Sequence, residues 1–241
     1  MNIQKFPDHD ALSQHTAEHI AALVNQKPDA LLCLASGDTP IETYRRLVAL
    51  AQAGRVDVSR CTFVGLDEWV GFGPDDAGSC SYYVYRDLFR PLGLRSEQIH
   101  TFNAKADELK AECARIDALI DSRGGLDLLL VGMGMNGHIA LNEPGTPFTN
   151  GCHVVELAES TKTVGQKYFD QETVLTQGIT LGLRHLTGAR DVILLVSGPK
   201  KAPMLHTALT GPVTEQVPAS IVQTQPNVRV WVDEDAGRLV V

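Results

Sequence analysis

The chain has 241 residues, 44% of them hydrophobic, and carries 21 Lys and Arg against 29 Asp and Glu, for a net charge of −8. This length allows one large α/β domain with a substantial core, whereas the acidic balance argues against a nucleic-acid partner. The N-terminus lacks an apolar signal segment, and no apolar run approaches the roughly 18 residues of a membrane-spanning helix. We therefore expect a cytoplasmic protein without a nucleic-acid or membrane partner.

The cysteines indicate a reducing compartment. Their number is five, which is odd, and they are widely spaced with no C-x-x-C pair. This pattern argues against a disulfide framework and against a zinc site, so no metal is expected.

Hydrophobic periodicity predicts helices and strands in alternation along the chain. The first elements expected are a helix over residues 10–26, a short buried strand over 30–35, a helix from Pro40 to about Ala53 and a strand over 61–66. Helices over 81–89 and 105–122 and a strand over 126–131 follow. Later strands are predicted over 153–157, 178–181, 192–196, 220–223 and 228–232, and later helices over 162–170, 183–188 and 200–209.

This alternation predicts an α/β fold of the Rossmann-like, doubly wound type, with a mostly parallel sheet covered by helices on both faces. No segment resembles a linker, so a single domain is expected over residues 1–241. Ligands bind such sheets beyond the carboxyl ends of the strands. Polar clusters follow three predicted strands, at Ser36–Thr39, Asp67–Glu68 and Asn136–Glu143, and we expect these clusters to converge on one site.

The first cluster, Ser36-Gly37-Asp38-Thr39-Pro40, lies between a strand and a helix. Exposed backbone N–H groups and the helix dipole favour phosphate binding at such a position. The alternative is an ordinary turn in which Asp38 or Thr39 caps the helix. The carboxylate of Asp38 would repel a bound anion unless it points outward.

The second cluster places two carboxylates next to each other at the end of a strand. Strand alternation sends Asp67 and Glu68 to opposite sides, so at most one of them faces a ligand. The flanking Leu66 and Trp69 provide apolar surroundings that can raise the pKa of a carboxyl toward that of a general base. The alternative is a solvated acidic loop.

The third cluster lies in Asp127–Gly145, which fits the dinucleotide-binding pattern G-x-G-x-x-G with Gly132, Gly134 and Gly137. That reading requires a long helix directly after the third glycine, but Pro144 interrupts the segment. His138 and Glu143 instead suggest an acid/base pair on a tight turn, with a purely structural histidine as the alternative. No third ligand at a characteristic spacing supports a metal here. Further on, Lys167 and the pair Lys200-Lys201 can supply positive charge for an anionic ligand, although they can equally be solvated.

With these clusters identified, the chain resembles the glucosamine-6-phosphate deaminase/isomerase family, including the galactosamine-6-phosphate deaminases, from about residue 28 to residue 235. The related 6-phosphogluconolactonases share the fold and the Gly-rich turn, but typically continue with Asp-Gly-His-Thr-Ala-Ser. The resemblance rests on Ser36-Gly-Asp-Thr-Pro40, Leu66-Asp-Glu-Trp69, Gly132-x-Gly-x-Asn-Gly-His-Ile-Ala-x-Asn-Glu-Pro144 and Gly198-Pro-Lys-Lys-Ala202.

The resemblance implies conversion of an aldosamine 6-phosphate into a ketose 6-phosphate and ammonia without metal or organic cofactor. It implies that Asp67 is the base that moves a proton between C2 and C1, that His138 assists ring opening and that Glu143 orients His138. Asn136, counted with the catalytic residues, stands where many members have Asp, and Lys167 where many have Arg. Substrate contacts are expected from Ser36, Gly37, Asp38, Thr39, Glu68, Gly134, Lys167 and Lys201.

Several properties stay open at the level of sequence. The hexosamine substrate can be the gluco or the galacto epimer. His153 and Val155 stand where allosterically regulated hexameric members carry basic residues, so a monomer or small homo-oligomer is expected. The alternative functions are a 6-phosphogluconolactonase and a non-catalytic phosphosugar-sensing domain, such as the effector domains of some bacterial repressors.

Overall fold

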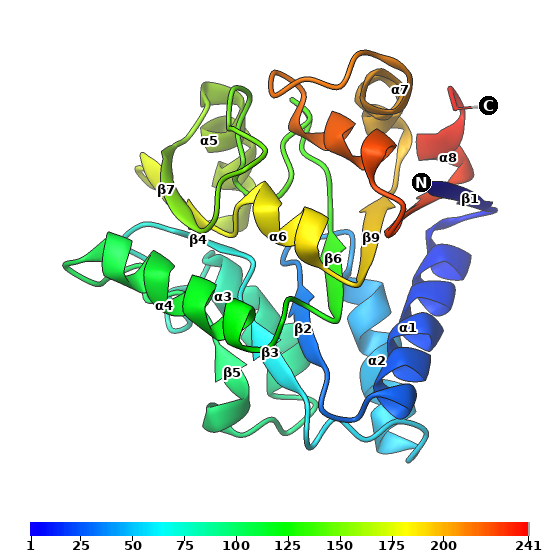
Figure 1. Cartoon of the computed structure of the whole chain (residues 1–241), viewed down its shortest axis with the longest axis vertical. Coiled ribbons are helices and arrows are strands. Elements are labelled where there is room, and N and C mark those ends of the chain that lie inside the picture. The colour runs from blue at the N-terminus through cyan, green and yellow to red at the C-terminus, as the bar shows by residue number, and fades with distance from the viewer. Residues whose placement is uncertain (241) are drawn as a thin grey trace.

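A seven-stranded sheet forms the centre of the protein in a computed structural model, which describes residues 1–240 (Figure 1). Its strand order is β1-β10-β9-β6-β2-β3-β5, and every pairing between neighbours is parallel. The strands are β1 (Asn2–Phe6), β2 (Leu31–Leu34), β3 (Thr62–Val64), β5 (Ile99–His100), β6 (Leu128–Val131), β9 (Asp191–Val196) and β10 (Val228–Asp233).

Helices cover both faces of this sheet, which confirms the predicted doubly wound α/β fold. The longer helices are α1 (His9–Gln26), α2 (Ile41–Gln52), α4 (Leu109–Ser122) and α7 (Ala202–Thr210). Four shorter ones are α3 (Cys80–Val84), which continues as a π-helix over Tyr85–Phe89, α5 (Glu159–Gly165), α6 (Leu183–Gly188) and α8 (Glu234–Gly237).

Alternation along the buried strands divides the core into two layers. In β6, Leu128 and Leu130 pack with residues of α1 and α2, whereas Leu129 and Val131 pack on the opposite face with residues of α4, α6 and α7. A strand buried on both faces is apolar at every position, which explains why these segments read as continuous apolar runs.

A second, three-stranded antiparallel sheet lies beside the main one, in the order β4-β8-β7. It consists of β4 (Asp67–Trp69), β8 (Gln177–Thr180) and β7 (His153–Glu156). The chain leaves the parallel sheet after β3 and pairs Asp67 with Thr180 of β8. Asp67 therefore lies at the start of a new strand, and not at the end of β3 as the sequence indicated.

One predicted strand is wrong, and two short strands of the main sheet were missed in addition to β4. Residues 220–223 belong to a 3-10 helix over Pro218–Thr224 that begins with a proline. Ile221 and Val222 are buried against the core, so their apolar character reflects burial and not strand pairing. The missed strands β1 and β5 form the two edges of the sheet, where hydrophobic patterning is weak.

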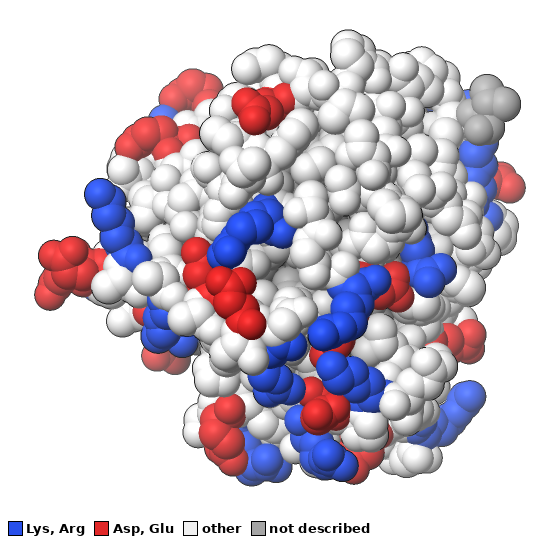
Figure 2. Space-filling model, in the orientation of Figure 1, with Lys and Arg blue, Asp and Glu red and all other residues white. Residues whose placement is uncertain are grey.

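The surface shows no concentration of one charge in the view of Figure 2, where Lys and Arg side chains alternate with Asp and Glu side chains. The upper part of this face, over α7, is largely uncharged (Figures 1 and 2). Among the described residues, no helix combines the length and the apolar character needed to cross a membrane.

Gly182, between β8 and α6, provides a test of the packing. A Cβ there would lie 2.0 Å from the carbonyl oxygen of Asn150 and 2.1 Å from that of Gly151. We expect Gly182→Ala to lower the free energy of unfolding by about 1–3 kcal/mol, because backbone atoms must move. Urea denaturation measures the difference. Gly188, at the end of the same helix, has open space around it, so Gly188→Ala is the control; equal midpoints for the two variants would contradict the packing.

Candidate active site

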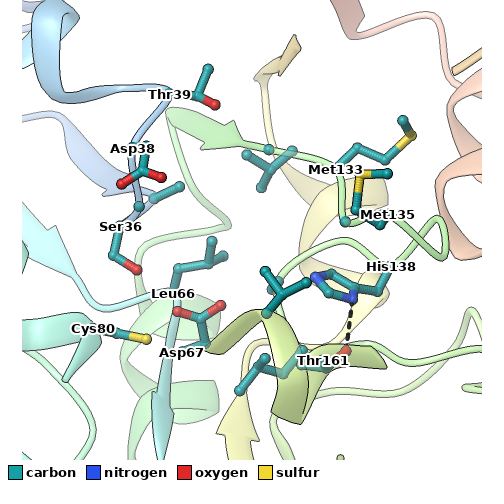
Figure 3. A pocket seen from close by; sticks show the side chains of 18 of the residues that line it. Ser36, Asp38, Thr39, Leu66, Asp67, Cys80, Met133, Met135, His138 and Thr161 are labelled. Carbon is teal, nitrogen blue, oxygen red and sulfur yellow. Dashed lines mark hydrogen bonds between the residues drawn. The ribbon is translucent and has the colours of Figure 1, made fainter. Parts of the chain in front are cut away.

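The three polar clusters converge on one cavity, as the sequence predicted (Figure 3). The cavity has a volume of about 220 Å³ and opens at the carboxyl ends of β2, β6 and β9. Its lining includes the segments 35–40 and 130–136, together with Leu66, Asp67, Cys80, His138, Thr161, Lys167, Tyr168 and Lys201.

Asp67 presents its carboxylate to this cavity. Its Oδ1 atom is buried and has no hydrogen-bond partner within residues 1–240. Burial, and next the charge of Glu68, raise the pKa of Asp67 to about 7, although a hydrogen bond from the Cys80 thiol lowers it in part. A carboxyl with this pKa can accept and return a proton near neutral pH, as a general base must.

Glu68 does not line the cavity, so the structure contradicts the substrate contact expected of it. The side chain is 1% exposed and points to the other side of β4. Its carboxylate accepts hydrogen bonds from the backbone N–H groups of Trp69, Cys80 and Ser81, at 2.8 to 2.9 Å. Glu68 thus fixes the start of α3 against β4. The prediction that Asp67 and Glu68 point to opposite sides of the strand, so that only one of them faces the cavity, is confirmed.

The Gly-rich turn after β6 packs against the ring of His138 and lacks the following helix that a dinucleotide-binding loop requires. The backbone N–H of Gly134 donates to the carbonyl of His138 at 2.9 Å. A Cβ on Gly134 would lie 2.4 Å from the His138 ring, so only glycine allows the ring to pack on the backbone. Gly137 and Ala140 both have positive φ, +83° and +53°, and an alanine in this region is strained. No helix begins within residues 135–152.

His138 lies within reach of two partners. Its Nδ1 atom is 3.3 Å from Oγ1 of Thr161 and 3.6 Å from Oε2 of Glu143, the latter a separation typical of an ion pair and too long for a hydrogen bond. The side chain of His138 is 20% exposed and faces the cavity, whereas that of Glu143 is buried behind it.

Glu143 is held ionised by its neighbours. Burial raises its pKa, but hydrogen bonds and the charge of His138 outweigh this effect and lower the pKa to about 2. Nδ2 of Asn136 donates to Oε2 of Glu143 at 2.8 Å, and the backbone N–H of Ala158 donates to Oε1 at 3.2 Å. The carboxylate is therefore a fixed negative charge beside the imidazole of His138.

Positive charge gathers at another side of the cavity. Nζ of Lys201 donates to the carbonyl of Met133 at 2.6 Å, and burial, followed by the charge of Lys167, lowers the pKa of Lys201. At the rim, Nζ of Lys167 lies 2.6 Å from Oδ2 of Asp38 and 4.7 Å from the centre of the Tyr168 ring. In a chain of net charge −8, two ammonium groups at one cavity form a local anion-binding region.

The loop before α2 completes this region. Gly37 has φ of +101°, and within the described part of the chain no side chain caps the start of α2. The turn alternative, in which Asp38 or Thr39 caps the helix, is therefore wrong. Residues 36–40 line the cavity just before this uncapped helix start, a position that favours an anion.

Three further side chains line the cavity that sequence reasoning missed, namely Cys80, Thr161 and Tyr168. Cys80 follows a Gly-rich loop, and the other two lie beyond β7, far along the chain from Asp67 and His138. Nothing in their local spacing distinguishes them from ordinary helix residues, so only the tertiary fold identifies them.

Residues 7–231 match the model of the family described as glucosamine-6-phosphate isomerases/6-phosphogluconolactonase, and the chain belongs to this family. The resemblance seen in the sequence is thereby confirmed. The chain is 40% identical over 241 residues to the glucosamine-6-phosphate deaminase of Geobacillus sp. (strain WCH70), a match that covers 100% of this chain and 96% of that protein. It is 39% identical over 232 residues to the putative deaminase AgaI of Escherichia coli (strain K12), covering 93% and 89%.

Solved structures extend this comparison. A monomeric glucosamine-6-phosphate deaminase of the NagB superfamily superimposes with a TM-score of 0.95 at 36% identity, covering 99% of this chain and 100% of that one. A 6-phosphogluconolactonase from Leishmania guyanensis gives a TM-score of 0.78 at 19% identity, covering 100% and 98%, and shares the fold.

The raised pKa of Asp67 predicts a pH-dependent stability difference. Between about pH 4 and 7 the folded chain holds a proton on Asp67 that the unfolded chain releases, so this group's contribution to stability is lost as pH rises. Asp67→Asn removes that loss. We expect its free energy of unfolding, relative to the unaltered chain, to increase by about 2–3 kcal/mol from pH 5 to pH 8.

Urea denaturation at several pH values measures this difference. Asp170 is exposed, so Asp170→Asn provides the matched control and should show no such trend. A difference between Asp67→Asn and the unaltered chain that stays constant over this pH range would contradict the desolvation of Asp67.

Proposed function

We propose that the chain is an aldosamine-6-phosphate deaminase/isomerase, which converts glucosamine 6-phosphate or galactosamine 6-phosphate into the ketose 6-phosphate and ammonia. The observation that carries this proposal is the carboxylate of Asp67. Its buried oxygen lacks a partner, and it shares a cavity with two lysines and with His138, behind which Glu143 is buried. The reaction requires a base, an acid for ring opening and a phosphate site, and these groups supply all three without a metal or organic cofactor.

The 6-phosphate is proposed to bind at the positive region of the cavity. The loop Ser36–Thr39 offers backbone N–H groups at the start of α2, and Lys201 and Lys167 offer ammonium groups. The Lys167–Asp38 ion pair lies at the rim, with both side chains about half exposed or more. A bound phosphate would attract Lys167 in place of Asp38, since a dianion is the stronger partner.

His138 is proposed to act as the acid that opens the sugar ring. The imidazole faces the cavity, and the ionised carboxylate of Glu143 lies behind it, with Oε2 3.6 Å from Nδ1. The imidazolium of His138 can give its proton to the ring oxygen of the sugar as the C1–O bond breaks, while the C1 hydroxyl passes its proton to water and becomes the aldehyde. Asn136 holds Glu143 through its amide and does not exchange protons, so the relay consists of His138 and Glu143.

Asp67 carries the next step. Its carboxylate removes the C2 proton of the open-chain sugar, the freed electron pair forms a double bond between C2 and C1, and the C1 carbonyl oxygen takes up a proton from water, so that an enolamine results. The same carboxyl returns the proton to C1, which leaves an iminium at C2. Water adds to this carbon, and ammonia leaves to give the ketone. One base can reach both carbons because they are adjacent, and phosphate binding fixes their orientation.

The choice between epimers and the assembly state are part of the proposal. The similarity to the putative deaminase AgaI keeps galactosamine 6-phosphate as a candidate beside glucosamine 6-phosphate. We propose that residues 1–241 act as one catalytic domain in a monomer or small homo-oligomer. A relative described as monomeric supports this assembly. The lactonase and sensor alternatives lack a use for a carboxyl whose pKa is raised to about 7.

Ammonium release from purified protein tests the reaction. We expect release with glucosamine or galactosamine 6-phosphate, and we expect Asp67→Asn to lower kcat by about 100- to 10,000-fold, because it removes the base and no phosphate contact. KM should change little. Release from neither sugar by the unaltered chain, with hydrolysis of 6-phosphogluconolactone instead, would overturn the proposal, as would near-normal turnover of the variant.

The phosphate site has its own test. Lys201→Met removes an ammonium group from the cavity. We expect KM to rise by about 10- to 100-fold, which corresponds to the loss of one hydrogen bond to a charged group. Asp38→Asn keeps the shape of the rim and removes a negative charge, so KM should fall. Steady-state kinetics on both variants measures the two shifts. A lower KM for Lys201→Met, or a higher one for Asp38→Asn, would place the phosphate elsewhere.

A further inference from the structure

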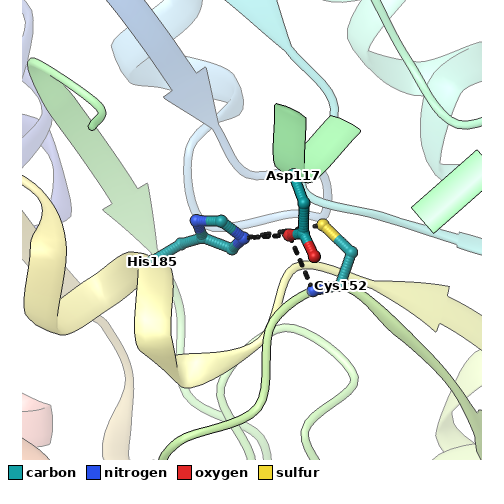
Figure 4. Close-up of side chains that lie close together, drawn as sticks. All are labelled: Asp117, Cys152 and His185. Carbon is teal, nitrogen blue, oxygen red and sulfur yellow. Dashed lines mark hydrogen bonds and ion pairs between the residues drawn. The ribbon is translucent and has the colours of Figure 1, made fainter. Parts of the chain in front are cut away.

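A second cluster of reactive side chains lies away from the cavity (Figure 4). Asp117 comes from α4, Cys152 from the segment before β7 and His185 from α6. Nε2 of His185 is 2.5 Å from Oδ1 of Asp117 and 3.6 Å from Sγ of Cys152. One atom of each residue lies within 4.8 Å of the other two, and none of the three residues lines the active-site cavity.

The backbone around this cluster is fixed. The N–H of Cys152 donates to Oδ1 of Asp117 at 3.0 Å. A Cβ on Gly151 would lie 2.6 Å from Oδ2 of Asp117, so a glycine is needed for this approach. The N–H of Arg184 donates to the carbonyl of Asn150 at 3.0 Å, which ties the segment to α6. The three side chains are therefore held in place before any ligand arrives.

The separation of the sulfur and nitrogen atoms is close to that of two zinc ligands. With Zn–S of about 2.3 Å and Zn–N of about 2.0 Å, a tetrahedral site places S and N about 3.5 Å apart, and the observed separation of Cys152 Sγ and His185 Nε2 is 3.6 Å. The His185–Asp117 pair is about 0.8 Å closer than the N–O edge of such a site, because a hydrogen bond now joins the two atoms. Replacing that hydrogen by a metal would separate them.

We propose that Asp117, Cys152 and His185 form a zinc-binding site, with water as the fourth ligand. A thiolate, an imidazole and a carboxylate are donors that Zn²⁺ binds, whereas Mg²⁺ and Ca²⁺ prefer oxygen ligands alone. The side chain of Asp117 is 25% exposed and Cys152 is half-buried, so an ion can enter from solvent. On binding, the S–H bond of Cys152 breaks, the Zn–S bond forms and the proton passes to water. Nε2 of His185 likewise loses its proton to water and binds the ion, while Nδ1 takes up a proton so that the imidazole stays neutral.

The charges balance at this site. A thiolate and a carboxylate together carry −2, which Zn²⁺ neutralises. The guanidinium of Arg184, 3.3 Å from Oδ1 of Asp117, then turns to its second partner Asp121, 3.4 Å away. The ion would join α4 and α6 to the segment that leads into β7. Because β7 pairs with β8, and β8 with β4, zinc would stabilise the sheet that carries Asp67.

This site does not depend on the proposed function, and metal-binding measurements test it directly. Reduced protein, freed of metal by a chelator, is titrated with Co²⁺ and then with Zn²⁺. We expect one equivalent of Co²⁺ to give a thiolate-to-cobalt charge-transfer band and the strong visible bands of a tetrahedral ion, and Zn²⁺ to remove both. Zn²⁺ at about 100 times its Kd should raise Tm by about 5–10 °C.

Variants assign the ligands. Cys152→Ser and His185→Gln should each lose the charge-transfer band or weaken Co²⁺ binding at least tenfold, whereas Cys80→Ser, which removes the other half-buried thiol, should keep both. A further measurement needs no variant: the unaltered protein is treated with iodoacetamide with and without Zn²⁺, and alkylation of Cys152 is measured on its peptide. We expect Zn²⁺ to protect Cys152. The proposal is overturned if Co²⁺ gives no thiolate band, if Cys80→Ser abolishes that band, or if Zn²⁺ leaves alkylation of Cys152 unchanged.

Discussion

One oxygen of the Asp67 carboxylate is buried without a hydrogen-bond partner within residues 1–240, and the rest of the site is arranged around this group. The chain leaves the parallel sheet after β3 and starts β4 at Asp67, which turns this side chain into the cavity. Its neighbour Glu68 is turned the other way and receives three backbone N–H groups. Strand geometry thus separates two adjacent carboxylates. The backbone N–H groups bind Glu68 at the start of α3, whereas Asp67 receives none of them and faces the cavity.

The charged groups in and behind the cavity also differ in how firmly their partners hold them. Glu143 is fixed by Asn136 and by the N–H of Ala158, so its charge acts on His138. The cations are less constrained. Lys167 binds Asp38 at an exposed rim, where an ion pair contributes little to stability and can be exchanged for a ligand. An acidic protein can therefore hold a phosphosugar by local cations, with catalytic groups positioned deeper in the same cavity.

Much of this arrangement could be predicted from the sequence, because continuous apolar runs mark the buried parallel strands and polar residues follow them. Local patterns failed where tertiary packing decided the outcome. The apolar residues Ile221 and Val222 are buried in a 3-10 helix and not in a strand, and β4, β8 and β7 form a separate antiparallel sheet. Cysteine spacing argued against a metal site, but spacing along the chain does not detect Asp117, Cys152 and His185, which the fold brings together from three elements.

Direct titration of the Asp67 carboxyl tests the central claim, that desolvation prepares this group as a base. Infrared difference spectra of the unaltered chain minus Asp67→Asn, recorded from pH 4 to pH 9, isolate the carbonyl band of the protonated carboxyl. The structure predicts that this band persists at pH 6 and disappears with a midpoint of about 7. A midpoint near 4, the value of an ordinary aspartate in water, would contradict it.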